Sequence, residues 1–163
     1  MNVMTTPRWN FAEAEAYKLA KNYSAPPIPV YEIAEQNGAN VLFVDFGPNS
    51  ERVSGLCDFA AARIYVNKLD HPQRQAFTIA HELGHWMLHR EYFLKEPEKY
   101  PVLARFGDPD KDNPMEKEAN KFAACLLVPS HLLKPVLGAS VSALAEIFGV
   151  SRTMMEFCVQ NAK

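Results

Sequence analysis

Cysteine is scarce in this chain of 163 residues and is poorly placed for cross-linking. Cys57, Cys125 and Cys158 are odd in number and far apart, and no C-x-x-C pair occurs. This pattern argues against a disulfide framework and against a cysteine-rich zinc site. We expect the three side chains to be reduced, buried thiols.

An excess of charge of one sign is also lacking, because 17 Lys and Arg stand against 19 Asp and Glu. A net charge of −2 gives no electrostatic attraction to DNA, RNA or anionic lipid. No apolar run approaches the ~18 residues of a membrane span. The N-terminus reaches acidic residues before any apolar run, unlike a signal peptide. We therefore expect a cytoplasmic protein with no membrane partner and no charge that favours nucleic acid.

Apolar residues, by contrast, make up 48% of the chain, enough for the core of one compact domain. Helical and strand-like patterns alternate along the sequence and predict a mixed fold. The expected helices are 10–23, 30–38, 114–127 and a long one opened by Asp70, His71 and Pro72 that runs to about Arg90; the expected strands are 39–46 and an antiparallel pair within 52–67. Between the last two long helices, 91–113 reads as a long connection, either a lid or binding loop or a mobile segment.

The end of the chain, 130–163, has the pattern of three short helices, the last two arranged like a helix-turn-helix. Ser142 and Ser151 would cap these two helices, with Gly149 in the turn. Two basic and two acidic residues cancel within 140–163, whereas a DNA-reading element carries a basic face. We expect this part to pack on the rest of the chain or to dock a protein partner.

The stretch FTIAHELGHWMLHR, residues 77–90, carries most of the chemistry. His81 and His85 lie four apart, so on a helix both imidazoles face one cation, while Glu82 is placed to hold a water. Two imidazoles and a carboxylate suit zinc, with a fourth position left for water. The ion lowers the pKa of that water toward about 7, and Glu82 removes its proton. A short H-E-x-x-H pattern also arises by chance, so a helix that merely carries histidines is the alternative.

Two other residues of this stretch need separate interpretation. Gly84 costs a helix about 1 kcal/mol relative to Ala, which is tolerable where another backbone must come close. His89 is on the same face one turn after His85, but three successive i,i+4 ligands on a straight helix spread along its axis. We expect His89 to be a residue of the helix C-terminus, favoured by the helix dipole.

A third protein ligand is needed, and MEKEANKFAACLLVP offers Glu116 and Glu118. HELGHWMLH followed by EKEANKFAACLLVP strongly resembles the ImmA/IrrE-type zinc metallopeptidases, and ARIYVN upstream and ALAEIFGVSRTMME downstream match the family layout over roughly residues 10 to 160. The resemblance implies an α+β, zincin-like fold, in which a small antiparallel or mixed sheet packs on the HExxH helix and a second Glu-bearing helix. It also implies a domain over 1–129 with a helical extension over 130–163.

The ligand set follows from the same resemblance. The related E-x-x-A-[DN] pattern places its first Glu on the metal, which here is Glu116, with Ala119 and Asn120 completing the pattern. Helix geometry agrees, because Glu116 and Asn120 share a face and Asn120 can support a ligand by a hydrogen bond. Glu118 points about 200° away from Glu116 and is expected to face solvent, and it stays the alternative ligand. One Zn²⁺ per chain is expected, although manganese or iron would also suit these donors.

Proteins similar to this one cleave specific protein partners, often helix-turn-helix repressors. The resemblance therefore implies a zinc endopeptidase acting on a regulatory protein, for which the product of the adjacent gene is a candidate. The alternative is a non-proteolytic partner such as the antitoxin of a toxin–antitoxin module; a DNA-binding regulator is the third class. In zincin folds an edge strand can pair with an extended peptide, and the predicted substrate strand is Arg63, Ile64, Tyr65, Val66 and Asn67. The residue that stabilises the oxyanion is left open among Tyr65, Tyr92, Tyr100, Arg105 and His131.

Overall fold

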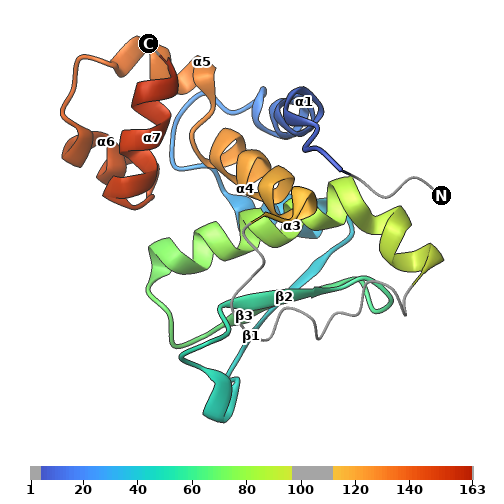
Figure 1. Cartoon of the computed structure of the whole chain (residues 1–163). Coiled ribbons are helices and arrows are strands. Elements are labelled where there is room, and N and C mark those ends of the chain that lie inside the picture. The colour runs from blue at the N-terminus through green and yellow to red at the C-terminus, as the bar shows by residue number, and fades with distance from the viewer. Residues whose placement is uncertain (1–4, 97–111, 163) are drawn as a thin grey trace.

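The computed structural model describes residues 5–96 and 112–162. The chain folds as α+β, and α3 lies between the sheet and the helices α4 and α1 (Figure 1). The helices are α1 Trp9–Ala20, α2 Val30–Gln36, α3 Pro72–Lys95, α4 Pro114–Leu127, α5 Ser130–Leu133, α6 Val141–Phe148 and α7 Arg152–Ala162, with short 3-10 turns η1 Gly47–Asn49 and η3 Lys134–Val136. The strands are β1 Asn40–Val44, β2 Gly55–Asp58 and β3 Arg63–Asn67. The predicted zincin-like α+β architecture is confirmed.

The sheet has the strand order β1-β3-β2. β2 and β3 form the predicted antiparallel pair, with Leu56 opposite Tyr65, and β1 runs parallel to β3. β3 therefore lies in the middle, and both of its edges are occupied. Ile64 and Val66, which share a face because side chains alternate along a strand, are fully buried in the core.

The long helix α3 begins where the sequence predicts, with His71 as the flanking residue and Pro72 in the first turn. It continues one turn beyond the expected end, to Lys95, because its apolar face continues to the buried Phe93. The expected connection 91–113 thus begins as helix, and its remainder over 97–111 lies outside the described residues.

Gly84 marks the place where α3 and α4 come closest. A Cβ atom at Gly84 would lie 3.2 Å from the Cα of Ala119 and 3.1 Å from Cδ1 of Phe122. Such distances are tighter than normal packing, so the missing side chain lets the two backbones approach. The close approach confirms the interpretation of Gly84 and brings the acidic first turn of α4 beside the histidines of α3.

The C-terminal helices contribute to the same core, through buried residues that include Leu144, Phe148 and Met155. α6 is capped by Ser140, whose hydroxyl accepts a hydrogen bond from the N–H of Ala143, so the expected cap at Ser142 is wrong by two residues. Gly149 ends α6 with a φ of +70°, a left-handed conformation that favours glycine. The boundary between 129 and 130 stays a prediction.

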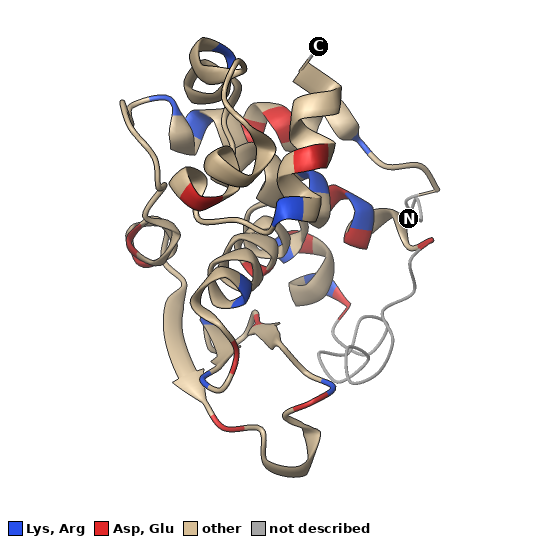
Figure 2. Ribbon diagram, turned by 90° about the vertical axis from the view of Figure 1, so that its left-hand side faces the viewer, with Lys and Arg blue, Asp and Glu red and all other residues tan. Residues whose placement is uncertain are grey.

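Charged residues are interspersed over the described part of the chain (Figure 2). Within that part, no helix combines the length and the apolar character needed to cross a bilayer. Among the cysteines, Cys57 is buried as expected, whereas Cys125 and Cys158 are half-buried, and all three are free thiols. Burial raises the pKa of Cys158 to about 11, which keeps its thiol protonated at neutral pH.

Candidate metal centre

Three side chains from two helices converge beside Gly84. α3 supplies His81 and His85, which lie one turn apart, and the first turn of α4 supplies Glu116. The Nε2 atom of His81 lies 2.9 Å from Oε2 of Glu116, and the Nε2 atom of His85 lies 3.1 Å from Oε1. One donor atom from each residue lies within 4.8 Å of the others, which is compact enough for a shared metal ion. We call these three residues the cluster.

The cluster fits zinc by its donor types and spacing. Two imidazole nitrogens and a carboxylate are a usual three-ligand set for catalytic zinc. Ligands ~2.0–2.1 Å from a tetrahedral zinc are ~3.3 Å apart. The two nitrogen–oxygen distances of 2.9 and 3.1 Å are slightly shorter than this, and no two donors are more than 4.8 Å apart, so small shifts of the side chains would reach zinc spacing. Burial alone would raise the pKa of Glu116, but hydrogen bonds and charge interactions with His81 and His85 outweigh it and hold that pKa well below its ordinary range. The carboxylate is therefore in the anionic form that binds a cation.

Asn120 supports His81 as the helix geometry predicts. The Nδ1 atom of His81 lies 2.9 Å from Oδ1 of Asn120, which is exposed and one turn after Glu116 on α4. The amide oxygen can only accept, so the proton of the neutral His81 ring sits on Nδ1. With a cation bound in the cluster, this tautomer would leave Nε2, the nitrogen that faces Glu116, as the atom that ligates the ion.

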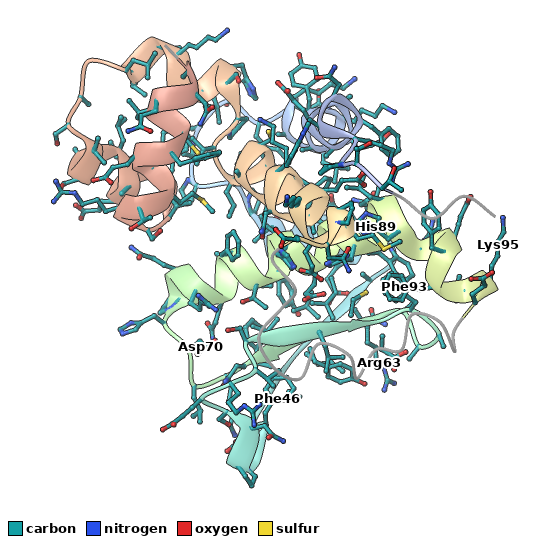
Figure 3. The ribbon with its side chains drawn as sticks, viewed as in Figure 1. Phe46, Arg63, Asp70, His89, Phe93 and Lys95 are labelled. Carbon is teal, nitrogen blue, oxygen red and sulfur yellow. The ribbon has the colours of Figure 1, made fainter. Side chains whose placement is uncertain are left out.

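His85 is supported by a chain of several hydrogen bonds rather than by one. Its Nδ1 lies 2.8 Å from Nδ1 of His89, and Nε2 of His89 lies 2.9 Å from Oε1 of Glu118. Arg8, just before α1, binds both oxygens of Glu118, through Nη2 at 2.9 Å and Nε at 3.0 Å, and donates its backbone N–H at 2.7 Å. We call His85, His89, Glu118 and Arg8 the buried relay, because the first three are 0% exposed. Figure 3 shows His89 where α3 passes α4.

Two expectations are corrected by the relay. Glu118 does not face solvent, because Arg8 and His89 cover that side of α4, and its carboxylate is absent from the cluster. Burial alone would raise the pKa of Glu118, but the hydrogen bonds from His89 and Arg8 lower it to about 2. His89 is not at a helix C-terminus, since α3 continues to Lys95, and it touches a ligand histidine instead. The i,i+4 spacing of His85 and His89 was the only signal in the sequence.

The predicted substrate strand is also corrected. Arg63, Ile64, Tyr65, Val66 and Asn67 form β3, whose two edges already pair with β1 and β2. An extended peptide cannot add to a central strand, so these residues do not offer a free edge. Asn67 has a structural part, because its side-chain amide donates to the carbonyls of Ser50 and Val53.

The predicted base and the oxyanion candidates lie outside the cluster. Glu82 follows His81 on α3 and is 4% exposed. Its role as the base stays a prediction. Of the oxyanion candidates, Tyr100 and Arg105 lie outside the described residues, and His131 makes a 2.8 Å hydrogen bond to the carbonyl of Tyr23.

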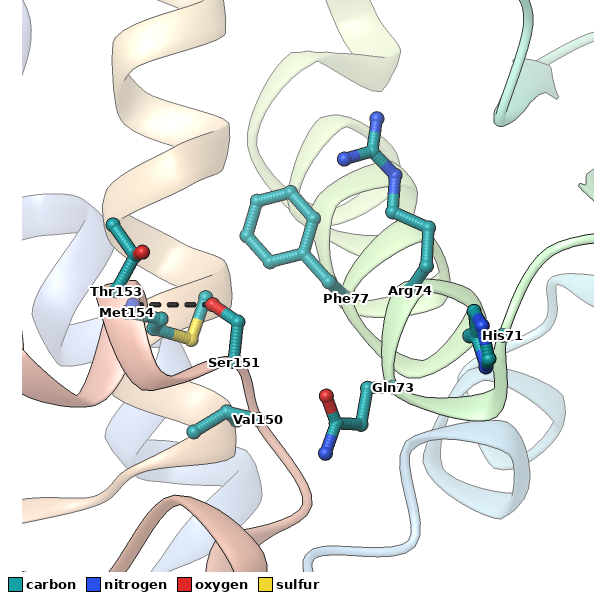
Figure 4. Close-up of a pocket in the computed structure, with 8 residues that line it drawn as sticks. All are labelled: His71, Gln73, Arg74, Phe77, Val150, Ser151, Thr153 and Met154. Atoms are coloured by element: carbon teal, nitrogen blue, oxygen red, sulfur yellow. Dashed lines mark hydrogen bonds between the residues drawn. The ribbon is translucent and has the colours of Figure 1, made fainter. Parts of the chain in front are cut away.

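A pocket of about 530 Å³ lies before the cluster along α3, and none of the three cluster residues lines it. It lies between the start of α3 and the start of α7, with apolar walls from Phe77, Val150 and Met154 (Figure 4). Its other lining residues are polar: His71, Gln73, Arg74, Ser151 and Thr153. The Phe77 ring centroid is 5.9 Å from that of His81, so this wall of the pocket touches the cluster.

The fold and the cluster together define the zincin-like class. The chain belongs to peptidase family M78, the IrrE N-terminal-like domain, whose family model matches residues 34–158. Among solved structures, a Mycobacterium tuberculosis transcriptional regulator is similar, with a TM-score of 0.66 and 15% sequence identity, over 93% of this chain and 46% of that one. This likeness shows the fold alone, and the present chain spans less than half of that chain's length. No curated protein sequence matches.

Proposed function

We propose that the protein is a zinc-dependent endopeptidase that cleaves a specific regulatory protein. The observation that carries the proposal is that one donor atom from each of His81, His85 and Glu116 lies within 4.8 Å of the others. One zinc per chain would be held by these three residues. Membership in a peptidase family supports the reaction class.

Each residue has a separate task in this reaction. A bound zinc would act as a Lewis acid that polarises the scissile carbonyl and lowers the pKa of water. Glu82 accepts the proton of the attacking water and passes it to the leaving amine. Asn120 holds the His81 ring by its hydrogen bond, so that Nε2 faces the cluster. The carboxylate of Glu116 would balance part of the positive charge of the bound ion.

We propose that β2, the edge strand beside β3, receives an extended peptide. It packs directly on α3. At Gly55 there is no room for a Cβ atom, which would collide with the side chain of Thr78, one turn before His81. Among the described residues, its outer edge pairs with no other strand. A peptide that adds to this edge would run past the histidines of α3.

The pocket beside His81 supports selection among substrates. Phe77, Val150 and Met154 offer apolar surface to one side chain of the peptide, while the cluster holds its backbone. A protein encoded by the adjacent gene, such as a helix-turn-helix repressor, is the partner we propose. The likeness of the sequence to proteases of such repressors supports that choice.

The test is an incubation of the zinc-loaded protein with the adjacent gene product, followed by mass spectrometry of the products. We expect one discrete cut, and Glu82→Gln should keep zinc but lose at least about 100-fold in cleavage rate, since general base catalysis contributes this much. Glu91→Gln, which changes an exposed acid on the same helix, should cleave as well as the wild type.

Two outcomes would contradict the proposal in different ways. Undiminished cleavage by Glu82→Gln would remove the role of Glu82 and point to a contaminating protease. Tight binding of the gene product by the zinc-loaded wild type without any cut would favour the non-proteolytic, antitoxin-like alternative.

A further inference from the structure

The buried relay has a defined direction of hydrogen bonding that starts at Arg8. Three N–H groups of Arg8 point at the Glu118 carboxylate, which can only accept them. The same carboxylate faces Nε2 of His89 at 2.9 Å, so this nitrogen carries a proton and donates it to Oε1. The orientation of the relay is therefore set at its far end.

The second half of the relay follows from the first. With its proton on Nε2, a neutral His89 ring has an acceptor at Nδ1. When Nε2 of His85 holds a cation, the ring proton of His85 sits on Nδ1, which lies 2.8 Å from this acceptor and donates to it. His89 thus holds the proton of His85 on Nδ1, and Nε2, which lies 3.1 Å from Oε1 of Glu116, is the nitrogen that would take the cation.

We infer that His89 is a positioning residue, which together with Glu118 and Arg8 fixes the tautomer and ring orientation of His85 for metal binding. This inference rests on the proposed metal centre. A metal-ligating histidine usually donates its second N–H to a carboxylate or a carbonyl group. Here His89 lies between the ligand His85 and the carboxylate of Glu118. Arg8 binds that carboxylate, so the chain of contacts runs from Arg8 through α4 and α3 to the cluster.

Because His89 is buried, a role in folding and a role in orienting His85 respond differently to substitution. His85, His89 and Glu118 are shielded from water, so no solvent can replace a lost hydrogen bond in this network. A residue needed only to fill space could be replaced by an apolar ring of similar shape. A residue needed to orient His85 could not, because the ring of His85 would lose its acceptor.

The experiment compares His89→Phe, which keeps a planar ring, with His89→Gln, which keeps one acceptor and one donor. Zinc affinity is measured by competition with a chelator, and folding of the zinc-free proteins by circular dichroism. His89→Phe should bind zinc about 10–100-fold more weakly, and His89→Gln should stay within about threefold of the wild type. His131→Phe is the matched control. His131 bonds the carbonyl of Tyr23 and belongs to neither the cluster nor the relay, so this variant should bind zinc as tightly as the wild type.

A second readout does not depend on any variant folding. In the isotope-labelled, zinc-loaded wild type, NMR should show a proton on Nδ1 of His85 and a nitrogen–nitrogen coupling across its hydrogen bond to Nδ1 of His89. A proton on neither of these nitrogens, wild-type affinity in a folded His89→Phe, or equal losses in the Phe and Gln variants would overturn the inference.

Failure of this inference can be told apart from failure of the proposed function. Zinc binding without cleavage, with the affinity ranking as expected, would refute only the peptidase. Cleavage with unchanged affinity in His89→Phe would refute only the positioning role. A wild-type protein that binds no zinc would overturn both.

Discussion

The two histidines of the cluster are supported in opposite ways. His81 is held by one hydrogen bond to Asn120 at the surface, beside the pocket, and its side chain is 15% exposed. His85 is fully buried and held by a relay that ends on Arg8, before α1. The comparison shows a centre with one open side and one side built into the core. A substrate would approach from the side of His81, while the side of His85 keeps the geometry fixed.

The largest expected effect is on zinc affinity, and it distinguishes the ligand Glu116 from Glu118, which supports a ligand through His89. Glu116→Ala should lower zinc affinity by at least about 100-fold, because it removes a metal ligand, whereas outer partners contribute 10–100-fold. Glu118→Ala should lower it less, because that carboxylate acts only through His89. Competition with a chelator measures both, and the reverse ranking would show that the ligand assignment is wrong.

The next effect compares the stability that the two sides contribute. Glu118→Ala leaves His89 and the Arg8 guanidinium without their shared acceptor. Breaking such a buried pair costs about 3 kcal/mol of unfolding free energy, at the lower end because Arg8 is 38% exposed. Asn120→Ala should cost about 1 kcal/mol or less, since water can reach His81. Urea unfolding of the zinc-free proteins checks this, and equal losses would mean that the relay is no more stabilising than the surface contact.

The relay also predicts how stability depends on acid. The pKa of Glu118 is lowered from 4.5 to about 2 in the folded protein, so its contribution is fully present above about pH 4.5. That contribution is lost as the pH falls toward about 2, when the folded carboxylate takes up a proton. Glu118→Gln should flatten this part of the stability curve without removing it, because Glu116 titrates in the same direction. An unchanged acid slope in the variant would contradict the ionic state assigned to Glu118.

The smallest effect concerns the open side of the centre. Asn120→Ala should weaken zinc binding by about 10-fold, the low end for an outer partner, because water can replace the exposed amide. Asn120→Asp should recover the loss, since a carboxylate accepts the same hydrogen bond from Nδ1 of His81. A loss from Asn120→Ala that exceeds that of His89→Phe would reverse the comparison between the two sides.

Each half of the cluster could be predicted from the sequence because its geometry is local, whereas the meeting of the two halves was implied by the family resemblance. His81 and His85 are one helical turn apart, as are Glu116 and Asn120, and the prolines at the starts of α3 and α4 mark where both helices begin. These relations depend on helix periodicity alone, which the sequence displays directly.

The relay and the strand order could not be predicted, since both depend on distant parts of the chain. Arg8 and Glu118 are 110 positions apart, and nothing in the sequence shows that the segment before α1 covers that side of α4. The position of β3 between β1 and β2 was missed for the same reason, because strand order is set by packing across the sheet.

The zinc content of the folded protein, after loading and removal of free metal, tests the account most directly. We expect close to one zinc per chain in the wild type and in Glu82→Gln, and a large loss in Glu116→Ala. A folded, fully loaded wild type that retains neither zinc nor another divalent ion would contradict the metal centre and the peptidase built on it.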